Sequence, residues 1–240
     1  MITRHHIGLA FGSMLILYFP LVLANPFVLA AIATGVCTGV ILPDIQMKKP
    51  RQFKALSIAW ILIQIFKKTV LRLYLFLYRY ILNMQHETED KRLTHSLPGL
   101  FFLTGLIGSG ILLLMWVCSV SPELYYPKIY LAGIIIGLLF HFVEDTCTKK
   151  GLFLFYPFNE TYRISGSIRP CNMDDSRIRL FHLHLLVVIV AIILLYCTGF
   201  CPYYLKWPVS IAALVTCITL MMYHAEVRIT CLPDPYKPVN

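Results

Sequence analysis

Charge is scarce in this sequence. Only 14% of the 240 residues are charged, and 12 acidic residues stand against 21 Lys and Arg. With 58% hydrophobic residues and a mean hydropathy of +0.71, the chain has too little polar surface for a soluble globular domain. The composition therefore predicts an all-α, polytopic membrane protein, with residues 1–240 forming a single integral membrane domain.

Several motifs of common enzymes are also missing. The sequence has no Walker loop and no dinucleotide-binding fingerprint, which leaves ATP and NAD chemistry without support. It has no Gly-x-Ser-x-Gly elbow, which argues against a serine lipase. The eight cysteines show no CxxC pair and no zinc-finger spacing. Cys197 and Cys201 lie four residues apart, and packing is the simpler reading of that pair than a local disulfide.

Six apolar runs are long enough to cross a bilayer. They are Ile7–Ala24, Pro26–Pro43, Leu97–Val120, Ile129–Val143, Leu180–Phe200 and Trp207–Tyr223. The first, second and fourth runs are near the lower length limit. We therefore expect a bundle of about six transmembrane helices.

The segment 51–85 differs from these runs because Lys and Arg interrupt it and aromatic residues are interleaved. This pattern predicts one or two basic amphipathic helices that lie in the membrane interface. A seventh and eighth span is the alternative, although the apolar stretch from Ala55 to Phe66 is short for crossing. The tail, residues 231–240, holds three prolines and is expected to be flexible.

Lys and Arg alternate between the connections of the six runs. Residues 44–96 carry ten and residues 144–179 carry six, while the connections predicted on the other side carry only Lys128 and Lys206. The positive-inside rule then places both termini and the two long loops in the cytoplasm of a cell with an inner membrane. A cleaved signal peptide ending near Ala24 is the alternative reading of the N-terminus.

The net charge of +9 is best explained by loops that face anionic lipid headgroups. The basic residues flank apolar spans and form no independent basic domain, so nucleic acid binding is not expected. Membrane lipids are the predicted partners.

All histidines fall at the predicted cytoplasmic end of a span or in a cytoplasmic loop. They are His5, His6, His86, His95, His141, His182, His184 and His224. Helix ends generally collect polar residues, yet the sorting to one side is complete.

Two carboxylates join this layer from separate helices. Asp44 ends the second run, and Asp145 follows His141 by four residues, on the same helix face. With His95 ahead of the third run, two imidazoles and two carboxylates lie at one depth. Such mixed ligands suit zinc, and an incomplete shell leaves a position for water. A carboxylate in the membrane without a partner costs roughly several kcal/mol or is protonated, and a metal removes that penalty.

Each of these residues alone has a simpler explanation. Asp44 after Pro43 can cap a turn. His95 can be an interfacial polar residue, and His141 with Asp145 can be a hydrogen-bonded pair that settles helix packing. The four taken together favour a site.

The order of these motifs resembles the YdjM-like family of bacterial and archaeal inner-membrane proteins, which are described as predicted metal-dependent hydrolases. The resemblance covers about residues 1–170. It rests on His6, on Leu42-Pro43-Asp44-Ile45, on Arg92-Leu93-Thr94-His95-Ser96 and on Gly137-x3-His141-x3-Asp145-x2-Thr148-x2-Gly151-x5-Pro157. The last two apolar runs carry no recognised motif.

Members of that family are distantly similar to the all-helical zinc phospholipase C and P1 nuclease superfamily, in which Asp and His hold metals and phosphoesters are hydrolysed. Carried onto this chain, the resemblance makes Asp44, His95, His141 and Asp145 the ligand candidates, with His6 as a further one. It implies Zn²⁺ or another divalent metal.

The sequence departs from the family pattern at two places. Gln46 replaces the second Asp of Pro-Asp-Ile-Asp, and Lys91, Arg92 and Leu93 stand where the family usually has His-Arg-Gly. One four-ligand site stays intact, while a second metal loses two expected ligands. Four residues at the same predicted depth are candidate substitutes: His182, His184, His224 and Glu226.

The leading hypothesis is a membrane-embedded, metal-dependent hydrolase of a lipid-linked ester, above all a phosphoester of a phospholipid, at the cytoplasmic face. Asp44 or Asp145 would take a proton, and Arg92 would bind a phosphate bidentately, with Lys91 and Lys150 as assisting charges. Thr94, like Ser96, would bond a ligand or a phosphate oxygen.

Two other classes of function stay open. The first is a non-catalytic, metal-stabilised membrane scaffold or partner-binding protein, which the missing family ligands favour. The second is ion transport. Two observations argue against it: the predicted outer halves of the spans hold no charged residue, and no inverted repeat is visible.

Overall fold

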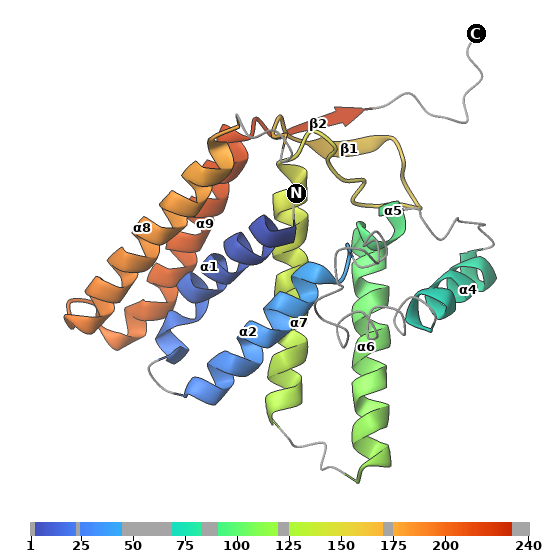
Figure 1. The fold of residues 1–240 in the computed structure, drawn as a ribbon, viewed down its shortest axis with the longest axis horizontal. Helices are drawn as coiled ribbons and strands as arrows, with labels where there is room; N and C mark the ends of the chain where they lie inside the picture. Colours follow the sequence, from blue (N-terminus) through green and yellow to red (C-terminus); the bar gives the residue numbers. More distant parts are fainter. Residues whose placement is uncertain are drawn as a thin grey trace.

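In the computed structural model, residues 3–22, 25–44, 69–82, 91–119, 125–169 and 175–231 are described, and they are mostly helical (Figure 1). All six predicted apolar runs form helices. These are α1 (Thr3–Val22), α2 (Pro26–Ile41), α6 (Leu97–Val117), α7 (Tyr125–Thr146), α8 (Arg177–Cys197) and α9 (Lys206–His224). Three shorter helices are α4 (Val70–Leu82), α5 (Lys91–Thr94) and the 3₁₀ turn η3 (Tyr203–Leu205).

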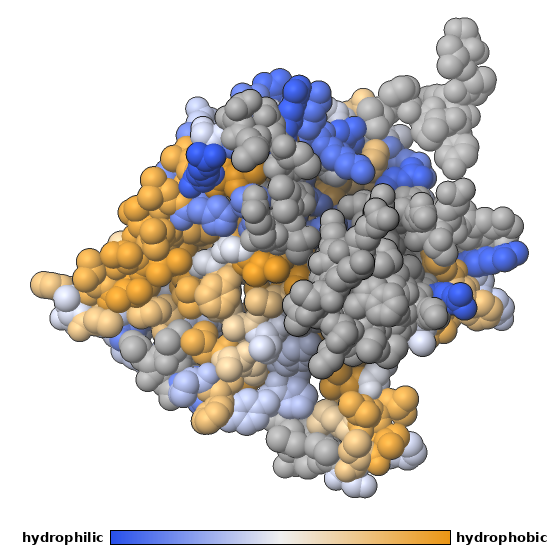
Figure 2. Space-filling model, viewed as in Figure 1, coloured by the Kyte–Doolittle hydropathy of each residue, from blue (hydrophilic) through white to orange (hydrophobic). Residues whose placement is uncertain are grey.

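Four stretches within the described residues are long and apolar enough to cross a membrane. They are Leu97–Val117, Tyr126–Thr146, Arg177–Cys197 and Tyr203–His224. Length and composition thus support a membrane protein, but with four candidate spans rather than the expected six. Helix α2 is apolar yet has only 16 residues, and α1 is not among the four candidates. Figure 2 shows hydrophobic side chains over α8 and α9 and hydrophilic ones gathered at the end of the molecule where β1 and β2 lie.

Local capping fixes where two of these helices begin. The side-chain oxygen of Asn25 accepts from the backbone N–H groups of Phe27 and Val28, and Pro26 occupies the first turn of α2. The hydroxyl of Ser96 accepts from the N–H of Gly99 at 3.1 Å and caps α6 in the same way. Asn25 therefore starts α2 immediately after α1, and Ser96 starts α6 immediately after His95.

Helices α2 and α7 pack backbone against backbone. Gly35 and Gly39 of α2 lie against Gly133 and Gly137 of α7. A Cβ atom at Gly39 or at Gly137 would lie 2.2 Å from a backbone carbonyl oxygen of the opposite helix, closer than any side chain tolerates. Small residues that let two backbones touch are typical of helix pairs in membranes. This contact fixes the height and rotation of α2 relative to α7, and with them the end of α2 that carries Asp44.

The loop after α7 contains a short antiparallel sheet. Strand β1 (Tyr162–Ser165) pairs with β2 (Arg228–Cys231), which follows α9, and Ser165 lies opposite Arg228. The purely helical expectation therefore needs this correction. Two strands of four residues each are too short to show an alternating pattern, and they form only because the chain end returns to the loop.

Further hydrogen bonds hold the loop to the start of α8 and the end of α9. The N–H of Ser167 donates to the carbonyl oxygen of Ala225 at 2.7 Å. Arg177 donates to the Ser167 hydroxyl at 2.6 Å and to both oxygens of Asp175 at 2.8 Å. The hydrogen bonds from Arg177 lower the pKa of Asp175 to about 2, so this carboxylate stays charged at neutral pH.

Some expectations fall partly outside the described residues. Of the predicted interfacial segment 51–85, residues 69–82 are described, and they form α4 with Leu73, Phe76 and Tyr80 exposed. In the predicted tail, Cys231 ends β2 and the residues after it are not described. Cys197 and Cys201 are free thiols, so the local disulfide is absent.

The glycine contact predicts a position-dependent response to one added methyl group. Gly39→Ala should lower the free energy of unfolding by about 1–3 kcal/mol, because the new Cβ forces the two backbones apart. Gly105→Ala on α6 is the matched control, since nothing lies within 4 Å of its Cβ position. Thermal unfolding of the purified protein in detergent measures both, and equal stability of the two variants would contradict the proposed role of the contact.

Candidate metal centre

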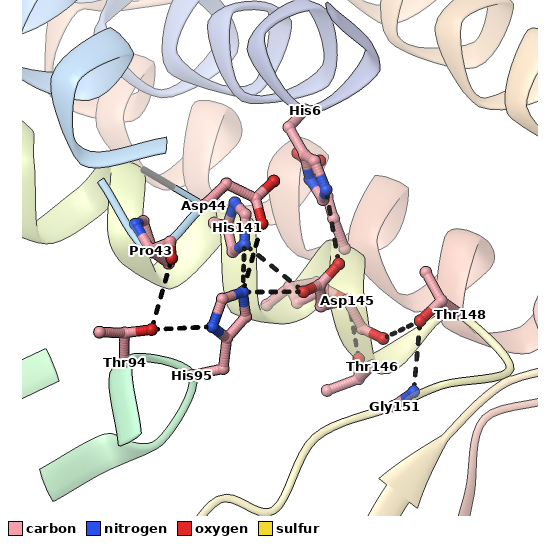
Figure 3. Close-up of polar contacts among 12 residues, drawn as sticks. His6, Pro43, Asp44, Thr94, His95, His141, Asp145, Thr146, Thr148 and Gly151 are labelled. Atoms are coloured by element: carbon pink, nitrogen blue, oxygen red, sulfur yellow. Dashed lines mark hydrogen bonds and ion pairs between the residues drawn. The ribbon is translucent and has the colours of Figure 1, made fainter. Parts of the chain in front are cut away.

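The five residues predicted as metal ligands lie together in the structure (Figure 3). His6 comes from the first turns of α1, Asp44 from the turn after α2, His95 from the junction of α5 and α6, and His141 and Asp145 from α7. Both His6 and His141 are fully buried. Segments far apart in the sequence therefore contribute to one cluster.

The spacing of three ligand atoms, from His95, His141 and Asp145, suits a tetrahedral ion. The Nε2 atom of His95 lies 3.4 Å from His141 Nε2 and 3.6 Å from a carboxylate oxygen of Asp44. The Asp145 Oδ2 atom lies 3.6 Å from His95 Nε2 and 3.4 Å from His141 Nε2. Ligands about 2.1 Å from a tetrahedral zinc ion are about 3.4 Å from one another. His95, His141 and Asp145 thus form one group whose spacing fits a divalent metal, and Asp44 approaches this group at His95.

Hydrogen bonds behind His95 orient its Nε2 atom toward this centre. The Thr94 hydroxyl donates to the carbonyl oxygen of Pro43 at 3.3 Å and so accepts from His95 Nδ1 at 3.1 Å. The lone pair is then left on His95 Nε2. Burial lowers the pKa of His95, against the opposing effect of the hydrogen bond to Asp44. The imidazole is therefore neutral at neutral pH, as a metal ligand must be.

Glu144, which is not among the residues predicted for the site, orients His6 in a comparable way. Its Oε2 atom lies 2.6 Å from His6 Nδ1, and both side chains are buried. A carboxylate that accepts from Nδ1 leaves the lone pair on His6 Nε2, the arrangement common behind metal-binding histidines. The signal was available: Glu144 is a second acidic residue beside Asp145 in an apolar helix, where an unpaired charge is costly.

Two buried imidazole nitrogens, His6 Nε2 and His141 Nδ1, have no hydrogen-bond partner. His6 Nε2 faces the second oxygen of Asp145 at 3.4 Å. His6, Asp44 and His141 form a second group with ligand atoms close enough for a metal, and this group shares His141 with the first. A cation near His6 would give its Nε2 a partner. The donor set therefore accommodates one ion readily, and a second stays a prediction.

The other residues of the His95 motif lie around this cluster. Thr94 is buried behind His95, and Ser96 is the buried cap of α6. Arg92 is half-exposed; its guanidinium lies over the ring of Tyr156 and pairs with Glu160 at 3.3 Å. The side chain of Lys91 and the whole of Gln46 lie outside the described residues.

The remaining described histidines lie on other faces of the helices. The His5 ring lies 5.7 Å from that of His182, and the His184 ring lies 6.2 Å from that of His224. Within the described residues neither pair joins a group of three potential ligands, nor does Glu226. They share the depth of the cluster but do not replace the missing family ligands.

A cavity of about 510 Å³ opens beside the cluster. Asp44, His95 and Asp145 form part of its wall, and their two carboxylates are about 15% exposed. Its other lining residues are Arg92, Thr148, Lys149, Lys150, Gly151, Leu152, Phe153, Arg163, Ile168 and Arg169. The ligand cluster is thus accessible from a space large enough for a small polar group.

The His6–Glu144 pair predicts the effect of removing the carboxylate. Glu144→Ala should weaken zinc binding by about 10–100-fold, because His6 loses the group that fixes its ring and tautomer. Glu144→Gln keeps an oxygen that accepts from Nδ1 and should bind more tightly than the alanine variant. Titration against a competing chelator measures both, and an unchanged affinity in Glu144→Ala would remove Glu144 from the site.

Comparison with known proteins gives one family. Neither the curated proteins nor the solved structures contain a match to this chain. The family model described as YdjM inner membrane protein matches residues 1–226, which extends past the motifs into the last two helices. Together with helices apolar enough to span a bilayer, this match shows that the chain belongs to the YdjM inner membrane protein family.

Proposed function

We propose that this protein is a metal-dependent hydrolase that cleaves a lipid-linked ester, above all a phosphoester of a phospholipid, at the cytoplasmic face of the inner membrane. The observation that carries the proposal is the convergence of His95, His141 and Asp145, with ligand separations of 3.4–3.6 Å, beside a cavity with a basic wall. Asp44 joins them as a fourth residue, 3.6 Å from His95. Of these four, Asp44, His95 and Asp145 are in contact with the space where a substrate would lie.

A divalent ion such as zinc, held by those four residues and approached by His6, would lower the pKa of water toward about 7 and polarise a phosphoryl oxygen. Asp44 and Asp145 each have two oxygens, so a carboxylate can hold the ion with one and accept a proton with the other. Thr94 and Glu144 orient His95 and His6. The buried His141 is positioned by α7 itself.

Arg92 is suited to bind the phosphate. Its guanidinium lines the cavity, and the ring of Tyr156 supports its planar face at 4.7 Å. The fork of an arginine matches two phosphate oxygens at once. Binding substrate would draw Arg92 away from Glu160, a half-exposed ion pair that contributes little to stability.

The proposed orientation follows the alternation of Lys and Arg along the sequence. In this orientation α1 and α2 join the four candidate spans as membrane helices, and both termini face the cytoplasm. The cluster and its cavity then lie at the cytoplasmic boundary of the bilayer. A distant similarity to zinc phospholipase C and P1 nuclease, which is expected from the sequence motifs alone, would favour phosphoester chemistry at such a site.

Removing a ligand tests the proposal directly. His95→Ala and Asp145→Ala should each lose bound metal and at least about 100-fold of the hydrolysis of a phospholipid panel, because the ion and its ligands act as one unit. His184→Ala, at the same end of the molecule but outside the cluster, should keep both properties. Elemental analysis of the purified protein and phosphate or lipid release provide the measurements.

The scaffold alternative gives a different result in the same experiment. A protein that binds zinc but hydrolyses no phospholipid, and whose behaviour does not change in His141→Ala, would contradict the hydrolase. Loss of neither metal nor activity in His95→Ala and Asp145→Ala would end the proposal.

A further inference from the structure

The wall of the cavity beside the metal ligands is strongly basic. Five cationic side chains line it: Arg92, Lys149, Lys150, Arg163 and Arg169. The acidic side chains that line it are Asp44 and Asp145, both candidate metal ligands. Within the described lining the cations outnumber the carboxylates, and a bound divalent ion would add to this excess. Cations gathered on a concave wall attract anions and repel other cations.

One of these cations has an unused donor. The Nη2 group of Arg163 donates to the carbonyl oxygen of Lys149 at 2.5 Å, which holds the guanidinium in the loop. Its Nε atom is buried and has no hydrogen-bond partner. The Arg163 residue lines the cavity, so its guanidinium is placed where an anionic ligand can accept a charge-assisted hydrogen bond. The lysines Lys149 and Lys150 are exposed at the rim.

The same loop carries exposed aromatic side chains. Phe155 is 54% and Phe158 69% exposed. The carbonyl oxygen of Leu154 accepts from the N–H of Leu97 at 2.8 Å, which ties the loop to the first residue of the candidate span α6. Phe155 and Phe158 therefore lie at the level where this span begins, where large apolar side chains enter the lipid interface. A ligand in the cavity would be approached from the membrane surface.

We infer that the cavity selects a lipid whose phosphate headgroup is anionic and carries no ammonium group, so that phosphatidic acid or phosphatidylglycerol binds and the zwitterionic choline and ethanolamine lipids do not. The inference rests on the proposed function for the site but concerns recognition rather than chemistry. The phosphate is held by Arg92 and Arg163, and the lysines at the rim exclude a cationic headgroup.

Binding measured apart from turnover tests this inference. The full chain in a neutral detergent is titrated calorimetrically, with and without zinc, with dihexanoyl phosphatidic acid, dihexanoyl phosphatidylglycerol, dihexanoyl phosphatidylcholine and glycerol 1-phosphate. The two anionic lipids should bind at least about tenfold more tightly than the choline lipid, and their affinity should fall as salt is added. Glycerol 1-phosphate, which lacks the chains, should bind more weakly than dihexanoyl phosphatidic acid.

Replacing the two exposed lysines at the rim of the cavity should remove the preference for anionic lipids. Lys149→Gln combined with Lys150→Gln should weaken binding of dihexanoyl phosphatidic acid about tenfold and leave the choline lipid unchanged. Arg179→Gln is the matched control, because this exposed arginine lies near the start of α8 and does not line the cavity. Equal affinity for choline and anionic lipids, or no effect of the double variant, would overturn the inference.

The outcomes separate the inference from the proposed function. Anionic selectivity without hydrolysis of any lipid would keep the inference and remove the hydrolase. Hydrolysis with no headgroup preference would support the hydrolase and contradict the inference about the headgroup. Glycerol 1-phosphate that binds as tightly as the lipid would assign the cavity to soluble phosphate esters and contradict the lipid part.

Discussion

The close contact between α2 and α7 is the constraint on which the candidate site depends. Because Gly35, Gly39, Gly133 and Gly137 carry no side chain, the two helices approach until backbone meets backbone. Such packing has almost no freedom to slide or rotate, and Asp44 follows the end of α2 by only three residues. Its carboxylate is thereby set 3.6 Å from His95 Nε2 without any flexible linker. Ligand geometry within a few tenths of an ångström requires this kind of rigid support.

Charge explains how the cluster can exist in an apolar protein. Two partly exposed aspartates, the buried Glu144 and three buried imidazoles lie within a few ångströms of one another. Carboxylates accumulate repulsion there unless protons or a cation lie between them. Thr94 and Glu144 accept hydrogen bonds from the Nδ1 atoms of His95 and His6, so the other nitrogen of each ring presents a lone pair rather than a proton to the cluster. The site is therefore organised for a cation, and the basic cavity wall is organised for an anion that meets it.

The sequence predicted the helices and the ligands better than their surroundings. Long apolar runs predicted six helices, and the four-residue interval between His141 and Asp145 placed both on one face. Depth followed from the topology, but rotation about each helix axis did not. For this reason the sequence offers His182, His184 and His224 as substitute ligands, although His182 lies beside His5 and His184 beside His224. It does not distinguish Glu144, although this side chain contacts His6. The cavity and the β1–β2 pairing depend on how loop 148–169 folds back on the chain end, which no local pattern in the sequence encodes.

Strand β2, which follows α9, connects the two helices without a recognised motif, α8 and α9, to the wall of the cavity. Only Ala225, Glu226 and Val227 separate α9 from β2, and β2 pairs with β1, which contains the cavity-lining Arg163. Because this connection is so short, the position of α9 in the bilayer and the position of the strand that carries Arg163 are coupled: a change in the tilt of α9 would also move that strand.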